Sequence, residues 1–438
     1  MNKRLFLFAL SLFVFSGQIK AYDFVVNGMS FNVLSISNLT ASLASIDNSV
    51  ARDFIVPSTV EYAGKTLSVT TIDTRCFTPR TLSSITIPNT ISTIYEAAFT
   101  DLIVDSIIFQ EGTELLTIGG GYISCFVGQF DDGHVGKVFI GRDINYTNQY
   151  SSSLFGTTYL KSVEFGANVT SICKRAFSNA SNLEYVILPK NLESIGDLAF
   201  SGCAILKSIN LPQSVTHIGG GAFYGTGLDS LYIPEQVLVV ESMLFRECSK
   251  LKKVNIPNKA TQIGQYAFNN CKSLKEIVIP ESVSSIGKIA FKGCDSLHSI
   301  TILNPTPITI TDDVFSVSSY WDGVLYVPFS SKQLYSTTVP WSNFQKIEGV
   351  TSTEVFNTKI EYITPYPNPT SSILNLDFGD IIGSRCLMIF NSLGQQVYES
   401  KINENAFKLD VSNFPNGLYF IRVRNENNIQ SMARFIKN

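Results

Sequence analysis

The chain has 438 residues, of which 45% are hydrophobic and only 16% charged, and its 33 basic and 36 acidic side chains give a formal net charge of −3. This apolar content excludes a largely disordered chain, and the missing basic excess argues against nucleic-acid binding, which needs cations to neutralise phosphates. The 3 histidines are scattered, which weakens the case for a histidine-based metal or acid–base site.

Residues 1–21 have the pattern of a secretory signal peptide. Lys3 and Arg4 precede an apolar run from Leu5 to Phe15 that is too short to span a bilayer, and Ala21 stands at a suitable cleavage position. No later stretch reaches the roughly 18 consecutive apolar residues of a transmembrane helix. We therefore expect an exported chain without a transmembrane segment.

A repeat of about 23 residues fills the middle of the chain. Two of its positions recur with nearly constant spacing, and weaker copies on both sides bring the total to about eleven units. The recurring residues are Pro189, Pro212, Pro234, Pro257 and Pro280, and Phe177, Phe200, Phe223, Phe245, Phe268 and Phe291. Such self-similarity predicts a solenoid, in which each unit buries its apolar edge against the next.

The sequence pattern within each unit predicts its local structure. Leu-x-x-Ile-x-Ile predicts a short strand, and the proline that follows ends it because it has no N–H to donate. Val-x-x-Ile-Gly, as in Val283, Ile286 and Gly287, predicts a second extended piece with a turn at the glycine. Ala-Phe then places one small and one large side chain inside.

Both ends of the repeat array depart from the pattern in ways that suggest caps. Residues 22–70 hold atypical strands at Phe24–Val26 and Phe31–Leu34, and we assign them to an N-terminal cap. The solenoid is expected over residues 71–348, where the closing stretch 323–348 has a strand and then a helix-like segment with Tyr335, Trp341 and Phe344. Residues 349–364 form a polar linker.

Two units carry glycine-rich insertions, at Gly119–Gly121 and Gly128–Gly136. Asp131 and Asp132 allow a calcium loop, but their spacing favours a solvated turn. An active site would have to use Cys125, Asp131 and His134 in this region, yet no catalytic, phosphate-binding or metal motif occurs. We predict no enzyme activity, no catalytic residues, no metal and no cofactor.

The chain has 8 cysteines, and most of them follow the repeat. Four of them occupy the same position of the repeat, three residues after the phenylalanine, and form one column. The others stand in place of other repeat residues or lie in the tail. Stacked neighbours come close enough for disulfides, but the regular spacing favours buried thiols that act as small apolar side chains. The column residues are Cys203, Cys248, Cys271 and Cys294, and the rest are Cys76, Cys125, Cys173 and Cys386.

The repeat Ile-Pro-x-x-Val-x-x-Ile-Gly-x-x-Ala-Phe and the terminal Leu-Tyr-Val-Pro…Tyr…Trp…Phe unit resemble the BspA-like leucine-rich-repeat family of bacterial surface proteins. The resemblance covers about residues 22–348. It implies a mainly β leucine-rich-repeat solenoid with little helix. Some members of the family are adhesins for host proteins or other microbes, so the resemblance implies a class of partner and no particular ligand.

From Pro365 a different pattern begins. Six strand-like runs separated by turn residues in residues 365–438 predict a small β-sandwich. The segments YPNP, IFNSLGQQV and FPNGLYFIRV and the final lysine resemble the C-terminal sorting domain of type IX secretion substrates, although a generic immunoglobulin-like domain would share the strand pattern. The residues that carry this resemblance are Tyr366, Pro367, Asn368, Pro369, Gly394, Gly417, Tyr419 and Lys437. It implies recognition by the type IX secretion machinery of a Bacteroidetes-type bacterium, delivery across the outer membrane to the cell surface or beyond, and usually removal of the tail.

The outward positions of the first strand in each unit form ladders that could bind a ligand. Exposed aromatic side chains beside lysines suit a protein or glycan partner, although the same residues could simply be cross-strand pairs that stabilise the sheet. The candidate ligand-binding residues are Tyr185, Ile187, Lys207, Tyr232, Lys252, Lys253 and Lys275. We expect a surface adhesin for host or microbial proteins, with a glycan-binding or structural envelope module as the alternative.

Overall fold

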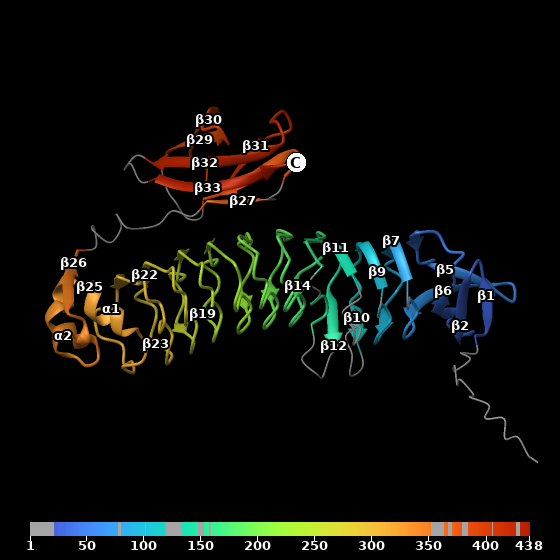
Figure 1. Cartoon of the computed structure of the whole chain (residues 1–438), viewed down its shortest axis with the longest axis horizontal. Coiled ribbons are helices and arrows are strands. Elements are labelled where there is room, and N and C mark those ends of the chain that lie inside the picture. Colours follow the sequence, from blue (N-terminus) through green and yellow to red (C-terminus); the bar gives the residue numbers. More distant parts are fainter. Residues whose placement is uncertain are drawn as a thin grey trace, which may run out of the picture.

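The computed structural model describes residues 22–77, 80–100, 102–119, 134–147, 153–156, 159–351, 363–366, 370–378, 384–404, 406–425 and 430–438. These residues form a long β-solenoid followed by a small antiparallel β-sandwich that lies along one side of it (Figure 1). The expected fold class, a mainly β solenoid of about eleven units with little helix and a β-sandwich after it, is confirmed. The predicted signal peptide and the insertion residues Cys125, Asp131 and Asp132 lie outside the described residues.

The first long side of the solenoid is made of parallel strands from most of its units. Alternate side chains in these strands are buried against the core, which is the pattern that Leu-x-x-Ile-x-Ile predicts. Most of these strands pair in register with the strand of the next unit, and the pairing is divided among three sheets. They are β4 (Asp53–Ile55), β7 (Arg80–Ile87), β9 (Leu102–Phe109), β11 (His134–Ile140), β13 (Ser162–Phe165), β15 (Tyr185–Ile187), β18 (Ser230–Leu231), β20 (Lys253–Val254), β22 (Glu276–Ile279), β24 (Ser299–Ile302), β25 (Val324–Pro328) and β26 (Lys346–Val350).

The second long side comes from the Val-x-x-Ile segments, which form shorter parallel strands. Exposed polar residues such as Thr216, Thr261 and Ser284 lie on this side. The strands are β8 (Thr93–Tyr95), β10 (Leu116–Gly119), β12 (Ile144–Thr147), β14 (Ser171–Ile172), β16 (Ser194–Ile195), β17 (His217–Ile218), β19 (Val239–Val240), β21 (Gln262–Ile263) and β23 (Ser285–Ile286).

The third edge of each coil is a turn that carries the repeated phenylalanine inward. Neighbouring rings stack nearly parallel, with centroids 5.5 Å apart for Phe155 and Phe177 and 5.3 Å apart for Phe245 and Phe268. The Phe245 amide also donates to the Ala267 carbonyl of the next unit at 2.7 Å. Side-chain stacking and backbone hydrogen bonds therefore join successive units on this edge, as the repeat predicts.

The repeated glycine does not form the turn that we expected from the sequence. The left-handed residue lies two positions further on, for example at Leu198 with φ 55° and at Tyr266 with φ 59°. The glycine is needed for another reason, which is the close approach of the preceding coil. A Cβ at Gly264 would lie 2.4 Å from the backbone nitrogen of Ser242, and one at Gly287 would lie 2.5 Å from that of Gln265.

Both ends of the solenoid are covered by structure that departs from the repeat. At the start, antiparallel strands lie beside the first coils, and the Ala63-Gly64 turn joins two of them in a hairpin. These strands are β1 (Phe24–Val26), β2 (Met29–Ser35), β3 (Thr40–Ile46), β5 (Thr59–Tyr62) and β6 (Lys65–Ile72).

The far end is closed by short helices that bury the predicted aromatic side chains. Trp341 has no exposed surface, and its Nε1–H donates to the Ile308 carbonyl at 2.7 Å. Tyr335 and Phe344 are buried beside it, and the rings of Trp341 and Phe344 pack against Phe315 of the last unit. The helices are α1 (Val317–Asp322), η1 (Phe329–Ser331), α2 (Lys332–Thr337) and η2 (Trp341–Asn343).

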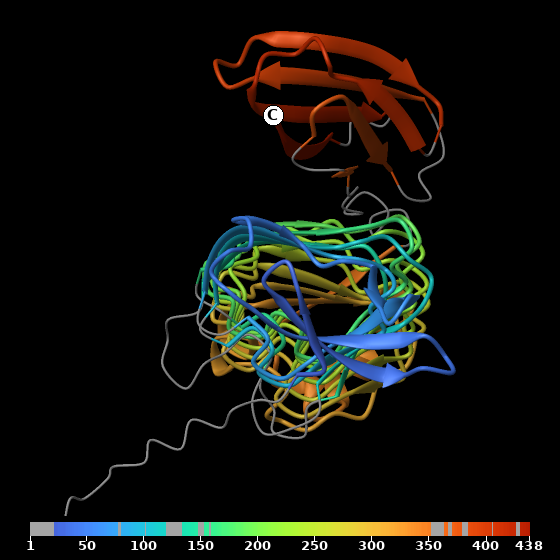
Figure 2. The same cartoon turned by 90° about the vertical axis from the view of Figure 1, so that its right-hand side faces the viewer.

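The C-terminal sandwich has two antiparallel sheets around a separate hydrophobic core (Figure 2). Leu374, Leu387 and Phe435 are among its fully buried residues. One sheet has the order β27 (Thr364–Tyr366), β28 (Ile373–Asp377) and β31 (Ala406–Asp410), and the other has the order β30 (Gln396–Ile402), β29 (Arg385–Asn391), β32 (Gly417–Asn425) and β33 (Gln430–Lys437). Each of the six predicted strands is present.

The cysteines of the described residues are free thiols, and the column of four is buried. Each column thiol donates to the carbonyl of the preceding unit's phenylalanine, as Cys248 does to Phe223 at 2.9 Å and Cys271 does to Phe245 at 3.1 Å. The favoured interpretation, small buried side chains in a core column, is confirmed for them.

This burial predicts a loss of stability in alkaline solution. Burial raises the pKa of the Cys248 thiol from 9.0 to about 11, because the thiolate would lose its hydration. The unfolded chain therefore releases this proton at lower pH than the folded chain, and the stability that the thiol contributes falls from about pH 9 upward. We expect the urea midpoint to drop across this interval and to drop less in Cys248→Ser, which keeps a hydroxyl donor but does not titrate there. An equal drop in both proteins would contradict the assignment.

Candidate ligand-binding face and C-terminal sandwich

The outward side chains of the first sheet from β13 to β22 form a continuous surface, which we call the ladder face. It consists of three columns whose members follow one another from unit to unit, as the pairing of Ser162 with Tyr185 and of Glu164 with Ile187 shows. The columns are Lys161, Glu184, Lys207, Asp229, Lys252 and Lys275; Ser162, Tyr185, Ser208, Ser230, Lys253 and Glu276; and Glu164, Ile187, Asn210, Tyr232, Asn255 and Val278.

All seven predicted ligand-binding residues lie on the ladder face. Tyr185, Lys207 and Lys253 are exposed, whereas Ile187 and Tyr232 are half-buried. The Tyr232 hydroxyl donates to Glu235 Oε1 at 3.3 Å, which holds this ring close to the sheet. The residues are therefore brought together on one surface, although not all of them are equally accessible.

Charges of both signs alternate along the first column from Lys161 to Lys252. Asp229 lies between Lys207 and Lys252, and its carboxylate is 3.6 Å from the Lys252 ammonium. This pairing reduces the basic character that the lysines alone suggest. Side-chain amides also fix the neighbouring coils, because Asn255 both donates to the Ile233 carbonyl and accepts from the Ile233 amide. The ladder face is thus a rigid, mixed-charge surface.

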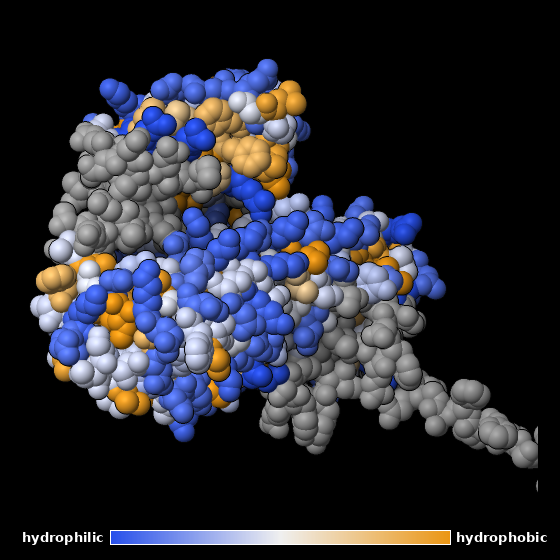
Figure 3. Space-filling model, turned by 60° about the vertical axis from the view of Figure 1, so that its left-hand side comes forward, coloured by the Kyte–Doolittle hydropathy of each residue, from blue (hydrophilic) through white to orange (hydrophobic). Residues whose placement is uncertain are grey.

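On the face shown in Figure 3, the solenoid is mainly hydrophilic with scattered apolar side chains, whereas apolar side chains gather on the C-terminal sandwich. Within the described ranges, no group of three or more histidine, cysteine, aspartate or glutamate side chains could hold a metal ion. The ring of His134 contacts that of Tyr159, and its two partners in the hypothetical active site are not described. No helix of the described residues is long and apolar enough to cross a membrane.

The motif residues of the C-terminal sandwich gather at one end of it. Gly417 pairs with Lys437, and the turn that contains Gly394 follows Asn391, which pairs with Tyr419. The buried Lys437 ammonium donates to the Asn438 carbonyl at 2.7 Å and to Asn416 Oδ1 at 3.4 Å.

Two further contacts tie this end together. The Tyr419 hydroxyl donates to the Pro415 carbonyl at 2.7 Å, and the Thr370 amide donates to the Ile436 carbonyl at 2.9 Å. Tyr366 lies on β27, while Pro367, Asn368 and Pro369 fall outside the described residues. Three segments that are separate in sequence therefore meet at the end of the sandwich that holds the C-terminus.

Comparison with known protein families identifies both the solenoid and the C-terminal sandwich. A family profile described as BspA type leucine rich repeat region matches residues 30–125, 148–272 and 239–359 in six copies, which together make up more than half of the chain. The chain belongs to the BspA-type leucine-rich-repeat family. A second profile, the secretion system C-terminal sorting domain, matches residues 364–438. This BspA-type protein is accordingly a type IX secretion substrate, directed to the cell surface or the extracellular space.

Solved structures and a curated relative show similarity as well. A leucine rich cell surface protein from Faecalibacterium prausnitzii is 22% identical, with a TM-score of 0.38, over 76% of this chain and 96% of that chain. A leucine-rich repeat protein from Bacteroides ovatus is 21% identical, with a TM-score of 0.38, over 75% of this chain and all (100%) of the other. The ulvan lyase NLR42 from Nonlabens ulvanivorans is 30% identical over 144 residues, which span 30% of this chain and only 27% of the lyase.

Some residues at the candidate site could not be found from the sequence. Asp229 also contacts Arg434 of the sorting domain at 3.6 Å, and the Asn210 side-chain amide donates to the Pro365 carbonyl. No repeat or motif marks Arg434, which is simply an outward residue of β33. The sequence offered only a weak signal, which is that Asp229, like Glu184, is an acidic side chain between two lysines of its column.

Proposed function

We propose that this BspA-type protein is a non-enzymatic binding protein of the bacterial surface that engages host or microbial proteins through the ladder face, as an adhesin. The observation that carries the proposal is the ladder face itself. It presents Tyr185, Lys207 and Lys253 on a rigid sheet that extends over many units, and rigid aromatic and cationic side chains are common anchors of protein interfaces.

The proposal assigns a role to each part of the chain. Residues 1–21 act as a signal peptide, residues 22–70 as the N-terminal cap, residues 71–348 as the binding solenoid with its C-terminal cap, 349–364 as the linker and 365–438 as the sorting domain. The same division supports a non-enzymatic role, because the repeat units supply structure and surface. The partial likeness to an ulvan lyase reaches 27% of that enzyme and gives no reason to assign its activity to this chain.

A tyrosine substitution on the ladder face tests the proposal directly. We expect Tyr185→Ala to weaken binding of the surface-purified protein to its best target in a panel of matrix proteins and bacterial cells by about tenfold or more, as for an aromatic hot spot. Tyr95→Ala is the matched control on the second sheet, since Tyr95 is 48% exposed and Tyr185 is 38% exposed. Surface plasmon resonance gives both affinities.

The result also separates the alternative functions. Equal losses in the two variants, or no binding to any protein or cell in the panel, would contradict the adhesin proposal. Binding confined to a glycan array would support the glycan-binding alternative, and an envelope defect on deletion without loss of adhesion would support a structural role.

A further inference from the structure

The sorting domain lies directly over part of the ladder face. Arg434 on β33 pairs with Asp229 at 3.6 Å, and the Asn210 side-chain amide donates to the Pro365 carbonyl. In two perpendicular views the sandwich rests against the side of the solenoid that carries the first sheet (Figures 1 and 2). The contact therefore joins segments far apart in the sequence through side chains on the surfaces of two separate cores.

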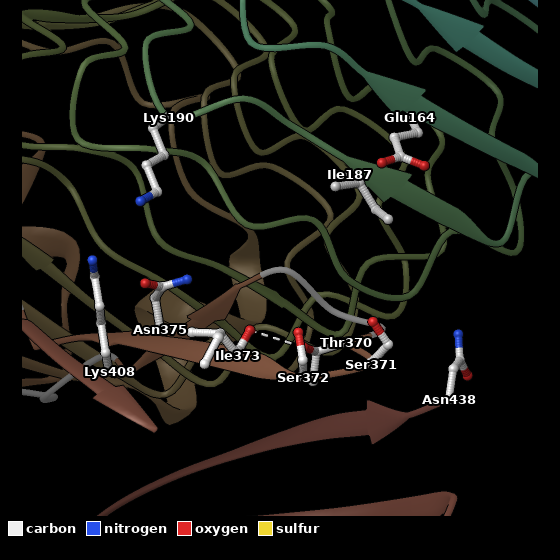
Figure 4. Close-up of a pocket in the computed structure, with 10 residues that line it drawn as sticks. All are labelled: Glu164, Ile187, Lys190, Thr370, Ser371, Ser372, Ile373, Asn375, Lys408 and Asn438. Carbon is white, nitrogen blue, oxygen red and sulfur yellow. Dashed lines mark hydrogen bonds between the residues drawn. The ribbon is translucent and has the colours of Figure 1, made fainter. Parts of the chain in front are cut away.

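Two cavities lie between the sorting domain and the solenoid. One of about 520 Å³ is lined by Tyr185 and Lys207 from the ladder face and by Leu418 and Arg434 from the sorting domain. The other, of about 530 Å³, has Glu164, Ile187 and Lys190 on the solenoid side (Figure 4). Its opposite wall consists of Thr370, Ser371, Ser372, Ile373, Asn375, Lys408 and Asn438.

The contact between the two parts can open without unfolding either of them. The buried residues of the solenoid and of the sorting domain form two separate hydrophobic clusters, so no shared core holds them together. Interfaces of this kind within one chain resemble transient protein–protein contacts, which separate readily.

The two surfaces nevertheless complement each other in charge. Glu164 and Glu184 of the solenoid line the cavities to which the sorting domain brings Lys408 and Arg434, and Asp229 pairs with Arg434 beside them. The solenoid also contributes Lys190 and Lys207 to these cavities, so the complementarity rests on the acidic side chains. Aliphatic side chains lie beside these charges on both sides, with Ile187 and Ile205 on the solenoid and Ile373, Leu418 and Ile436 on the sorting domain. The sorting domain thus fits this part of the ladder face as a protein partner would.

We propose that the sorting domain is an internal, removable cover for the ladder face around Tyr185, Ile187 and Lys207. While the sorting domain is attached, an external ligand competes with it for these residues. After it leaves, the exposed surface fits a protein that presents a basic side chain flanked by aliphatic ones. Only the statement about the external ligand rests on the proposed adhesin function, because the covering contact exists within the chain itself.

Cross-linking of the full chain tests the cover without any ligand. Lys190 and Lys408 line the same cavity, so an amine-reactive cross-linker should join them within one molecule. Mixing unlabelled and ¹⁵N-labelled protein distinguishes cross-links within a chain from those between chains. Absence of the Lys190–Lys408 product, or its formation only between chains, would overturn the proposal.

Charge variants give an independent measurement. Arg434→Glu should reduce the Lys190–Lys408 cross-link and raise the acetylation rate of Lys207 several-fold, because it removes the pair with Asp229. Lys401→Glu is the matched control, since Lys401 is exposed on β30, the opposite edge strand of the same sheet. Adding Asp229→Lys to Arg434→Glu restores an ion pair and should restore the cross-link. Equal acetylation rates of Lys207 in the wild type and in Arg434→Glu would overturn the proposal that the sorting domain covers this residue.

Competition between the sorting domain and an external ligand is then measured separately. For a target protein found with the Tyr185→Ala test, full-length Arg434→Glu should bind several-fold more tightly than the full-length wild type. Unchanged affinity together with the cross-linking result would reject competition while leaving the covering contact intact. Failure to find any target would instead count against the adhesin proposal.

Discussion

Replacing Phe245 by alanine should lower the free energy of unfolding by about 3–5 kcal/mol, the usual range for a fully buried phenylalanine. Phe245 has no exposed surface, and its ring stacks on Phe223 at 5.8 Å and on Phe268 at 5.3 Å. The cavity would lie in the middle of the array, where it weakens the interfaces with both neighbouring units. Urea unfolding followed by circular dichroism measures the change.

Phe329→Ala is the matched control for this substitution. Phe329 lies on η1 and is 71% exposed, so its loss should change the free energy of unfolding by less than about 0.5 kcal/mol. We also expect a broader transition in Phe245→Ala, because the two halves of the array would unfold less cooperatively. Similar shifts in the two variants would mean that the phenylalanine column does not stabilise the solenoid.

Replacing Trp341 by alanine should cost about 3–5 kcal/mol as well, since an entirely buried indole is removed. The ring lies 5.9 Å from that of Phe315, the last member of the phenylalanine column, and its N–H bond to the Ile308 carbonyl is lost too. The substitution would uncover the end of the core, and open solenoid ends favour association. We therefore expect both a lower urea midpoint and self-association.

The protein contains a second tryptophan that serves as the control. Trp321 on α1 is 66% exposed, so Trp321→Ala should leave the midpoint and the monomeric state nearly unchanged. Light scattering coupled to size-exclusion chromatography reports the association. A monomeric Trp341→Ala protein with the stability of Trp321→Ala would show that the aromatic cluster is not what closes the solenoid.

The repeat could be predicted well because its physical requirements are local and are repeated in every unit. A phenylalanine every 23 residues or so, beside a small residue, can only be buried by the next copy of the same pattern, and rings such as Phe177 and Phe200 do stack at 5.4 Å. The closing cluster around Trp341 followed from the same reasoning, since large aromatic side chains outside the repeat must cover its last edge.

The role of the repeated glycine could not be predicted in this way. Glycine suggests a left-handed turn, but Gly264 is needed because the backbone of the preceding coil passes within 2.4 Å of where a Cβ would be. The left-handed positions are instead occupied by residues such as Leu198 and Ile289, at φ values of 55° and 62°. Close approach between coils depends on how they stack, so it is absent from any single unit's pattern.

By itself, the sequence determined the solenoid, the columns of the ladder face and the sorting tail, because each depends on short spacings within a unit or a motif. Only the tertiary structure decided that the sorting domain lies beside Tyr185 and Lys207, through contacts such as Arg434 with Asp229. The contact between the two parts depends on complementary charges and shapes, which exist only once both surfaces have folded.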